Sequence, residues 1–277
     1  MSGILYVTGT PIGNLEDITL RQLRILQDAD FIAAEDTRVT RKLLTHFEIK
    51  TELVSCHEHS SDSVMQHIAD RIQAGESCAV VTDAGMPCIS DPGEELVRIC
   101  QERGIPIQAV PGPSAVITAL AVSGAAVKQF VFYGFLPVEK KQRAEMLSDL
   151  KSETRTAVLY EAPHKLEKTL SDLAEISAPD RKISLCRELT KIHEEVLRMS
   201  LPEAVNYYAG HAPRGEFVLV LDGVQKQEHV YTLEEAVTLA ETYLAEQKST
   251  SAAAKLAAKE TGIPKNQIYQ ALHTGND

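Results

Sequence analysis

The sequence lacks the long apolar runs that membrane-spanning segments need. Apolar stretches such as residues 115–121 fall far short of the roughly 20 residues that cross a bilayer as a helix. The chain opens with a strand-like segment, residues 4–7, and shows no signal-peptide pattern. We therefore expect a soluble, cytoplasmic protein with no membrane partner.

Cysteine is scarce and shows no C-x-x-C pair. The residues are odd in number and irregularly spaced, so we expect reduced and mostly buried thiols at Cys56, Cys78, Cys88, Cys100 and Cys186. Residues 56–59 contain two His beside Cys56, but no second cluster completes a tetrahedral set at a usual spacing. The sequence thus predicts no metal site.

Basic residues are outnumbered by acids. The chain has 28 Lys and Arg against 39 Asp and Glu, and its formal net charge is −11. This balance excludes a protein coated with positive charge for indiscriminate binding of nucleic acid. A polynucleotide partner would have to be recognised by shape and by a few placed Arg or Lys side chains.

The first half of the chain alternates between strand-like and helix-like segments. Its length of 277 residues suggests two ordinary domains with a small extra piece. The alternation predicts a parallel sheet covered by helices. The expected strands are residues 5–9, 31–35, 52–56, 78–83 and 106–110, and the expected helices are 19–27, 38–45, 63–73 and 94–102.

The second half predicts a mixed sheet, because two strand candidates follow each other without a helix. Its expected strands are residues 130–134, 157–161, 183–187, 195–199 and 216–222, and its helices are 140–150, 165–176 and 202–208. We place the boundary near 123–128, after a helix that starts at Pro113. The expected domains are residues 1–124, 125–224 and 230–277.

The last part of the chain predicts a small helical domain. A polar linker over 225–229 precedes helix candidates at 233–246, 251–261 and 265–272. Gly262 would stop one helix and Pro264 would start the next, which suits a helix-turn-helix. Residues 248–265 hold four Lys and one Glu. Packing or oligomerisation on the one hand, and contact with nucleic acid on the other, both remain open for these helices.

Four Gly- and Pro-rich or acidic turns directly follow strands of the first half, at residues 8–14, 35–38, 82–93 and 110–115. In a parallel sheet they would gather along one edge and form a binding cleft. No turn supplies the lysine of a triphosphate-binding loop, and no G-x-S-x-G nucleophile motif is present. Pro87, Pro111 and Pro113 remove backbone donors that a phosphate would need. The cleft therefore favours an uncharged or cationic ligand.

Seven motifs in this order resemble the ribosomal RNA small subunit methyltransferase I group of the tetrapyrrole methylase superfamily. They are LYVTGTPIGNL (5–15), AEDTR (34–38), TDAGMPCISDPG (82–93), PGPSA (111–115), YGFLP (133–137), YEAPHK (160–165) and PRGEF (213–217). The resemblance covers about residues 4–223, and the C-terminal helices look like that group's extra domain. It implies an α/β, two-domain tetrapyrrole methylase fold with a parallel-sheet first domain and a mixed-sheet second domain.

The same resemblance implies a function. The methyl donor would be S-adenosyl-L-methionine, and the acceptor the ribose 2′-hydroxyl of cytidine 1402 in 16S rRNA, within the small ribosomal subunit. The enzyme would act as a homodimer. Two alternatives stay open: a sister methylase acting on a small tetrapyrrole, and a non-enzymatic module that binds S-adenosylmethionine or RNA.

Alignment with the superfamily implies a set of cofactor-binding residues. Gly85-Met86-Pro87 occupies the place of a Gly-Asp-Pro turn, so Met86 departs from the pattern and backbone contacts are expected to dominate there. The residues expected to face the cofactor are Pro11, Ile12, Gly85, Met86, Ile89, Ser90, Ser114, Ala115, Ala162, Gly215 and Glu216.

A ribose hydroxyl is a poor acid, so a base or a cation beside the nascent alkoxide should help methyl transfer. The candidates for this role, among which the sequence does not choose, are Glu35, Asp36, Arg38, Arg187, Glu188 and Lys191. We also expect Lys and Arg to line the rim of the cleft, with acids on the outer faces.

Overall fold

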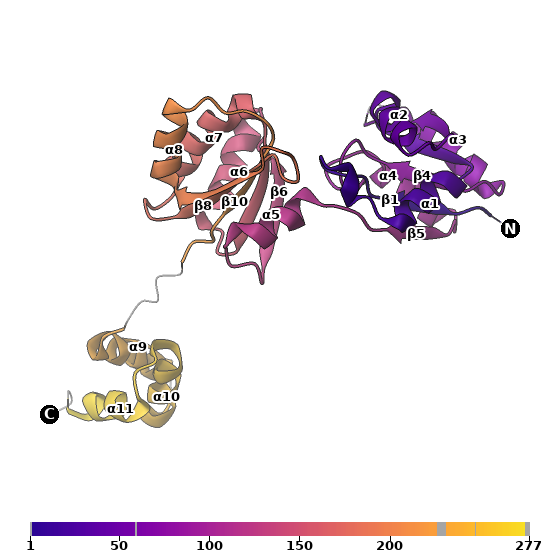
Figure 1. The fold of residues 1–277 in the computed structure, drawn as a ribbon. Helices are drawn as coiled ribbons and strands as arrows, with labels where there is room; N and C mark the ends of the chain where they lie inside the picture. Colours follow the sequence, from indigo (N-terminus) through magenta and orange to yellow (C-terminus); the bar gives the residue numbers. More distant parts are fainter. Residues whose placement is uncertain (1, 59, 226–230, 247, 275–277) are drawn as a thin grey trace. The chain divides into compact units, whose positions relative to one another are not determined.

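The structure, a computed structural model, describes residues 2–58, 60–225, 231–246 and 248–274 (Figure 1). The chain divides into two compact units, Met1–Val224 and Gln225–Asp277. All of the predicted linker except Gln225 lies outside the described residues.

The first sheet is parallel and has the order β3-β2-β4-β1-β5. Its strands are β1 (Leu5–Thr8), β2 (Phe31–Ala34), β3 (Glu52–Ser55), β4 (Cys78–Val81) and β5 (Ile107–Val110). The three central strands β2, β4 and β1 are rich in buried side chains, as expected for a sheet covered on both faces. The predicted parallel sheet is confirmed.

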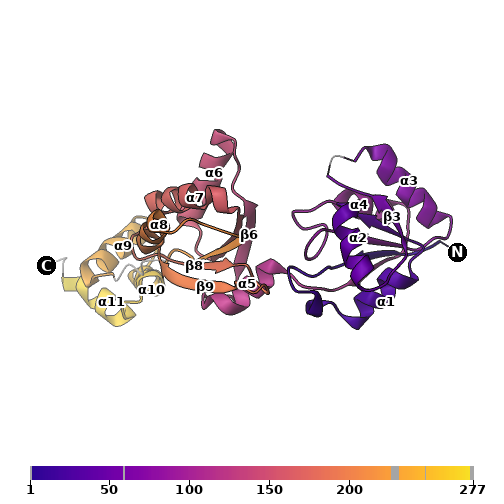
Figure 2. The same ribbon diagram turned by 45° about the horizontal axis from the view of Figure 1, so that its top comes forward.

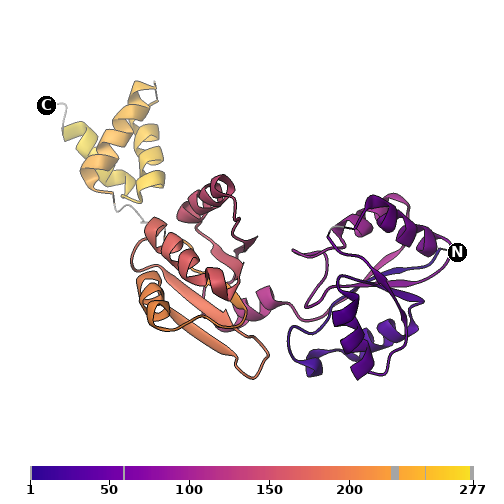
Figure 3. The same cartoon turned by 90° about the horizontal axis from the view of Figure 1, so that it is seen from above.

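Two layers of helices cover this sheet (Figures 2 and 3). Helices α1 (Leu20–Asp28) and α2 (Thr37–His46) contribute Ile25, Leu26 and Leu44 to the core on one face. Helices α3 (Asp62–Gln73) and α4 (Glu94–Glu102) contribute Ile68 and Leu96, among others, to the core on the opposite face. Right-handed crossover connections explain this division, because the chain reverses its direction across the sheet after β3.

The second sheet is mixed, with the order β6-β7-β10-β8-β9. Strands β6 and β7 are parallel and the other pairs are antiparallel, as the sequence predicted. The strands are β6 (Phe130–Phe135), β7 (Thr156–Glu161), β8 (Lys182–Arg187), β9 (Glu195–Ser200) and β10 (Phe217–Leu221), and the helices after Lys140 are α6 (Lys140–Ser152), α7 (Pro163–Ile176) and α8 (Leu201–Gly210).

Helix α5 (Ala115–Ser123) precedes the predicted domain boundary, yet it packs on the second sheet (Figure 1). Val116, Ala119 and Leu120 share a core with Val158 of β7 and Val220 of β10. The helix is apolar on nearly all sides, although only one side is buried: Ile117 and Val122 are 55% and 46% exposed. The segment before it therefore carries the connection between the two sheets.

The C-terminal unit is a three-helix bundle of α9 (Leu233–Ala245), α10 (Thr250–Thr261) and α11 (Lys265–Thr274). Small buried residues such as Ala236, Ala240 and Ala257 let the helices approach closely. Gly262 ends α10 in the left-handed conformation, with a φ of 73°, which confirms its predicted role as a stop signal.

Most element boundaries agree with the sequence prediction to within two residues. The sequence prediction missed one short 3-10 helix, Leu15–Asp17 (η1).

All five Cys are free thiols, and four of them are buried, as the sequence predicted; Cys88 is partly buried. Within the described residues, no helix is long and apolar enough to cross a membrane. In that same part of the chain no cluster of three or more His, Cys, Asp or Glu is arranged to hold a metal ion; His59 lies outside it.

Candidate active site

The loops after β1, β4 and β5 meet at the carboxyl edge of the first sheet, as the strand order requires. Thr10 and Gly85 form a two-way backbone bridge, with N···O distances of 2.8 and 3.1 Å. The amide of Gln22 donates to the carbonyl of Gly9 at 2.6 Å. These bonds hold loops that are far apart in the sequence in one rigid frame.

The β4–α4 loop has an unusual backbone. Gly85 has a φ of 91°, and the non-glycine residues Cys88 and Ser90 have φ values of 69° and 63°. Left-handed conformations cost non-glycine residues about 1–2 kcal/mol each, and such strain is concentrated at functional sites. The Met86 sulfur accepts a hydrogen bond from the Gly112 N–H at 3.3 Å, so Met86 ties this loop to the β5–α5 loop.

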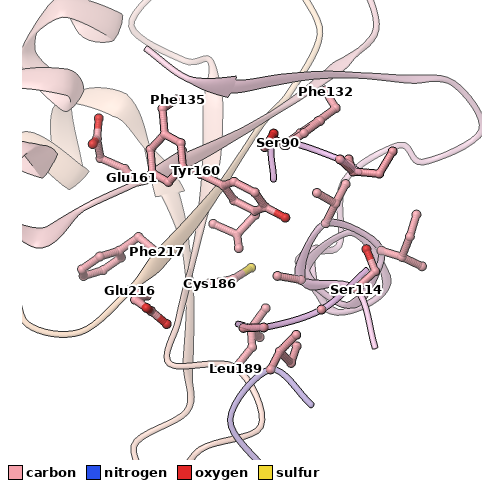
Figure 4. Close-up of a pocket in the computed structure, with 18 of the residues that line it drawn as sticks. Ser90, Ser114, Phe132, Phe135, Tyr160, Glu161, Cys186, Leu189, Glu216 and Phe217 are labelled. Atoms are coloured by element: carbon pink, nitrogen blue, oxygen red, sulfur yellow. The ribbon is translucent and has the colours of Figure 1, made fainter. Parts of the chain in front are cut away.

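A cavity of about 670 Å³ lies between these loops and the second sheet (Figure 4). A volume of this size accommodates a nucleoside-sized ligand. The first half of the chain and α5 contribute Ile12 and residues 84–86, 89–91 and 114–117. The second sheet and its loops contribute Phe130, Phe132, Phe135, residues 160–163, Cys186, Glu188, Leu189, Lys191 and residues 216–218.

Aromatic side chains form one wall of the cavity. The ring of Tyr160 lies 5.0 Å from that of Phe132 and 5.4 Å from that of Phe135, between centroids. Residues three apart on a strand normally face opposite sides, but a register shift between Phe132 and Gly134 places both Phe on the same face. Gly134 has a φ of 65°, which favours glycine at this bulge.

A buried carboxylate, Glu161, lies at the end of β7. It is 4% exposed and accepts hydrogen bonds from the Thr169 hydroxyl at 2.5 Å and the Ala162 N–H at 2.9 Å. Arg143 in turn donates to the Thr169 hydroxyl at 3.0 Å. The network fixes the start of α7 against the cavity. The carboxylate of Glu161 is therefore held by hydrogen bonds within the protein.

Lys191 bridges two other carboxylates of the cavity. Its Nζ lies 2.9 Å from Oε1 of Glu188 and 2.8 Å from Oε2 of Glu216. Burial opposes the charge on Lys191, but the hydrogen bonds to Glu216 and Glu188 outweigh it and raise its pKa. Lys191 is therefore a firmly protonated cation at the wall of the cavity.

Two glycines leave room for the side chains of Lys191 and Glu188. A Cβ on Gly215 would lie 2.4 Å from Cγ of Glu188, and a Cβ on Gly13 would lie 2.6 Å from Cγ of Lys191. Glu188 itself has a φ of 50°. The strained β8–β9 connection thus seats the Lys191 stem against the loop after β1.

Three acids from the carboxyl edge of the first sheet lie near one another: Glu35, Asp83 and Asp91. Glu35 accepts from the Thr82 hydroxyl at 2.5 Å and from the Asp83 N–H at 3.2 Å. Burial, followed by the nearby charge of Glu35, raises the pKa of Asp91 to about 6. Of the three, only Asp91 lines the cavity.

This raised pKa predicts that Asp91 lowers stability at neutral pH. Because the pKa of Asp91 in the folded protein, about 6, exceeds its ordinary value of 3.8, the folded state binds more protons between these values. Stability therefore falls as the pH rises through this interval. We expect Asp91→Asn to raise the melting temperature at about pH 7.5, with the gain disappearing towards about pH 4. A gain that does not change with pH, or a loss at neutral pH, would contradict this assignment.

Nine of the eleven residues expected to bind the cofactor line the cavity: Ile12, Gly85, Met86, Ile89, Ser90, Ser114, Ala115, Ala162 and Glu216. The other two lie just behind it. Pro11 is buried beside Ile12, and Gly215 packs against Glu188. Their assignment to cofactor binding stays a prediction.

The six candidates for chemistry occupy different places. Glu188 and Lys191 line the cavity. Arg187 pairs with Glu195 at 3.2 Å, and Arg38 pairs with Asp36 at 2.6 Å. Neither pair is part of the cavity wall, and neither is Glu35.

The charged residues in the cavity wall are mainly acidic. Lys191 is the one Lys or Arg among its described residues, beside the acids Asp91, Glu161, Glu188 and Glu216. The sequence-based expectation concerned the rim of the cleft, and it stays a prediction. Sequence reasoning missed the aromatic wall, although the motif YGFLP at 133–137 carried one signal for it.

The chain has one parallel and one mixed sheet, each packed with helices, and a cavity at the carboxyl edge of the first sheet. This architecture is that of a class of two-domain methylases. The family described as Tetrapyrrole (Corrin/Porphyrin) Methylases matches residues 4–205, and the RsmI C-terminal HTH domain matches residues 233–275. The chain therefore belongs to the tetrapyrrole methylase family. It is a methyltransferase, and methyltransferases of this family use S-adenosylmethionine.

Curated relatives refine this placement. Ribosomal RNA small subunit methyltransferase I of Halalkalibacterium halodurans is 45% identical over 275 residues, covering 98% of this chain and 95% of that protein. The protein of the same name from Thermotoga maritima is 46% identical over 221 residues, which are 80% of this chain but 99% of that protein. The latter therefore has no counterpart for about a fifth of this chain.

A solved structure shows the same fold. Uroporphyrin-III C-methyltransferase from Thermus thermophilus, complexed with S-adenosyl homocysteine, superposes with a TM-score of 0.56 at 18% identity. The superposition covers 79% of this chain and 97% of the Thermus thermophilus chain. The predicted two-domain tetrapyrrole methylase fold is confirmed.

Proposed function

We propose that the protein transfers a methyl group from S-adenosylmethionine to the ribose 2′-hydroxyl of cytidine 1402 in 16S rRNA. The observation that carries the substrate class is the 45% identity, over almost the whole chain, to a ribosomal RNA small subunit methyltransferase. The choice of nucleotide and of the 2′-hydroxyl rests on the seven ordered motifs.

The cavity fits the cofactor that we propose. Phe132, Phe135 and Tyr160 offer an aromatic surface for a flat base. Gly85 brings its backbone to the cavity wall without a side chain, while its N–H and C=O are bonded to Thr10. The excess of carboxylates over cations in the wall favours a ligand with a positive charge.

S-adenosylmethionine supplies, when bound, an activated methyl group on a positively charged sulfur. The residues of this chain then have to orient the acceptor hydroxyl, exclude water and stabilise charge on the acceptor oxygen. Alignment of the methyl group with the acceptor oxygen can supply much of the rate enhancement, so this proposal assigns no metal ligand among the described wall residues.

Among the six candidates we propose Lys191 as the cation that stabilises the developing alkoxide, with Glu188 and Glu216 holding its ammonium group in place. Lys191 lines the cavity and stays protonated, whereas Arg38 and Arg187 are paired outside the wall. For the other candidates after β2, namely Glu35, Asp36 and Arg38, we propose a structural role in the β2–α2 loop, where Asp36 caps α2.

We further propose that the enzyme acts as a homodimer in the cytoplasm, on rRNA within the small ribosomal subunit. For the domains, we propose an N-terminal α/β domain at residues 1–124, a second α/β domain at 125–224 and a C-terminal helical domain at 230–277. The separate family matches to residues 4–205 and 233–275 support a catalytic part distinct from the C-terminal helices. Those helices then serve either packing or RNA contact.

A methyl-transfer assay distinguishes this function from the two alternatives. The protein is incubated with labelled S-adenosylmethionine and either small subunits that lack the modification or a precorrin-type tetrapyrrole. We expect label in 16S rRNA alone. Label in the tetrapyrrole would establish the sister activity, and tight cofactor binding without any labelled product would indicate a non-enzymatic module.

A further inference from the structure

The two faces of the first sheet carry opposite charge. Helices α1 and α2 hold five Lys or Arg and one acid, Asp28: the cations are Arg21, Arg24, Arg38, Arg41 and Lys42. Helices α3 and α4 on the opposite face hold two Arg against five acids, namely Asp62, Asp70, Glu94, Glu95 and Glu102. Figure 2 shows α1 and α3 on opposite sides of the sheet.

The cations of the two faces also differ in their partners. On the α3–α4 face, Arg71 pairs with Glu52 and Glu76, and Arg98 pairs with Glu95 and Glu102. Arg103, which ends α4, pairs with Asp70 at 2.6 Å. These charges are neutralised within the protein.

On the α1–α2 face most cations have no such partner. Within the described residues, the side chains of Arg21, Arg24, Arg41 and Lys42 form no ion pair, and all four are exposed. Arg38 is the exception, because it pairs with Asp36. Unpaired, exposed cations on two neighbouring elements of an acidic protein retain their full charge for a partner of opposite sign.

The position of this face relates it to the cavity. Helices α1 and α2 begin directly after the loops that follow β1 and β2, so their first turns lie at the carboxyl edge of the sheet. The N–H of Asp36, which caps α2, donates to Asp83 of the β4 loop at 3.1 Å. Asp91 of that same loop lines the cavity. A chain that reaches the cavity from this side would pass over α1 and α2.

We infer that Arg21, Arg24, Arg41 and Lys42 form a docking surface for the phosphate backbone of the RNA substrate. This inference rests on the proposed function and deepens it, because it names the part of the protein that holds the RNA while one ribose enters the cavity. Phosphate contacts position a nucleic acid without reading its bases. An acidic protein can thus bind a polyanion through one local surface.

The experiment removes these charges and measures the salt dependence of RNA binding. Two double variants, Arg21→Gln/Arg24→Gln and Arg41→Gln/Lys42→Gln, and the quadruple variant are compared with the wild-type protein. The dissociation constant for small ribosomal subunits and the KM for methylation are measured over a range of salt. Each lost phosphate contact should reduce the log–log salt slope by about 0.7–0.9.

We expect the quadruple variant to bind subunits at least about tenfold more weakly at low salt, with a flatter slope and an unchanged dissociation constant for S-adenosylmethionine. The matched control is Arg98→Gln/Arg103→Gln on the opposite face, which should leave both RNA quantities unchanged. Melting temperatures establish that all variants are folded.

The inference is overturned if the quadruple variant keeps the wild-type slope and affinity, or if the control variant loses as much of either. A wild-type protein that binds subunits but methylates nothing would refute the proposed function, and the slopes would still decide whether this surface binds RNA. A wild-type protein that does not bind subunits would overturn the surface as well.

Discussion

Replacing Gly85 by Val should weaken the binding of S-adenosylmethionine by at least about 30-fold. Gly85 lines the cavity with a φ of 91°, a conformation in which a β-branched residue is a steric outlier. An added Cβ would already be at contact distance, 3.4 Å from Cγ2 of Ile12, so the expected loss comes mainly from the strained backbone conformation. A penalty of about 2 kcal/mol corresponds to this factor. Isothermal titration calorimetry with the cofactor measures it directly.

Gly104→Val is the matched control for Gly85→Val. Gly104 also has a positive φ, of 66°, but an added Cβ would meet no atom within 4 Å and the residue lies just after α4. Both variants should lose stability, and only Gly85→Val should lose cofactor affinity. Equal cofactor binding by the two variants would refute the assignment of Gly85 to the cofactor site. Met86→Leu should change the affinity by less than about fivefold, because it removes one weak hydrogen bond to sulfur.

Lys191→Met should lower the rate of methyl transfer at saturating cofactor by about 100-fold. Loss of one group that stabilises a developing oxyanion typically costs a factor of 10²–10³. The same change leaves Glu188 and Glu216 without their shared cation, so the wall becomes more negative. Affinity for the positively charged cofactor should therefore be kept or increased, while turnover falls. Single-turnover methylation and cofactor titration separate these two effects.

Lys182→Met serves as the control for Lys191→Met. Lys182 lies at the start of β8, on the same strand that leads to the Lys191 loop, and its nearest acid is Glu203 at 3.8 Å. Its removal should change neither turnover nor cofactor affinity. A Lys191→Met enzyme with turnover within threefold of the wild type would exclude Lys191 as the stabilising cation. Glu188 would then be the remaining one of the six candidates in the cavity wall.

The elements of the fold could be predicted because their signals are local. Alternating short apolar strands and amphipathic helices predicted the parallel sheet, and two consecutive strands predicted the antiparallel part of the second sheet. The strand order was not predictable in the same way, since it depends on contacts between segments up to about 100 residues apart, such as Leu5 with Ile107.

The site could be predicted in part. Loops rich in Gly and Pro marked the first half of the cavity, because their backbone conformations restrict the residues that can occupy them. The aromatic wall could not be derived from residue spacing, because it depends on a bulge between Phe132 and Gly134 that reverses the expected side-chain alternation. The Lys191 bridge likewise joins residues that are adjacent only after β8 and β10 have paired.

The roles of the acids could not be read from the sequence either. Asp83 and Asp91 follow the same strand, yet only Asp91 lines the cavity. Glu161 and Glu35 both lie at strand ends. Glu161 accepts a hydrogen bond from Thr169, whereas Glu35 accepts one from Thr82. Burial and hydrogen-bond partners decide these roles, and both are properties of the folded chain.

The central claim is tested most directly by methylation of small ribosomal subunits from a strain that lacks the modification, followed by mapping of the labelled nucleotide. We predict one labelled nucleotide, at cytidine 1402 of 16S rRNA, with the methyl group on the ribose 2′-oxygen. Label at another nucleotide, on a base atom, or in no RNA at all would contradict the proposed function.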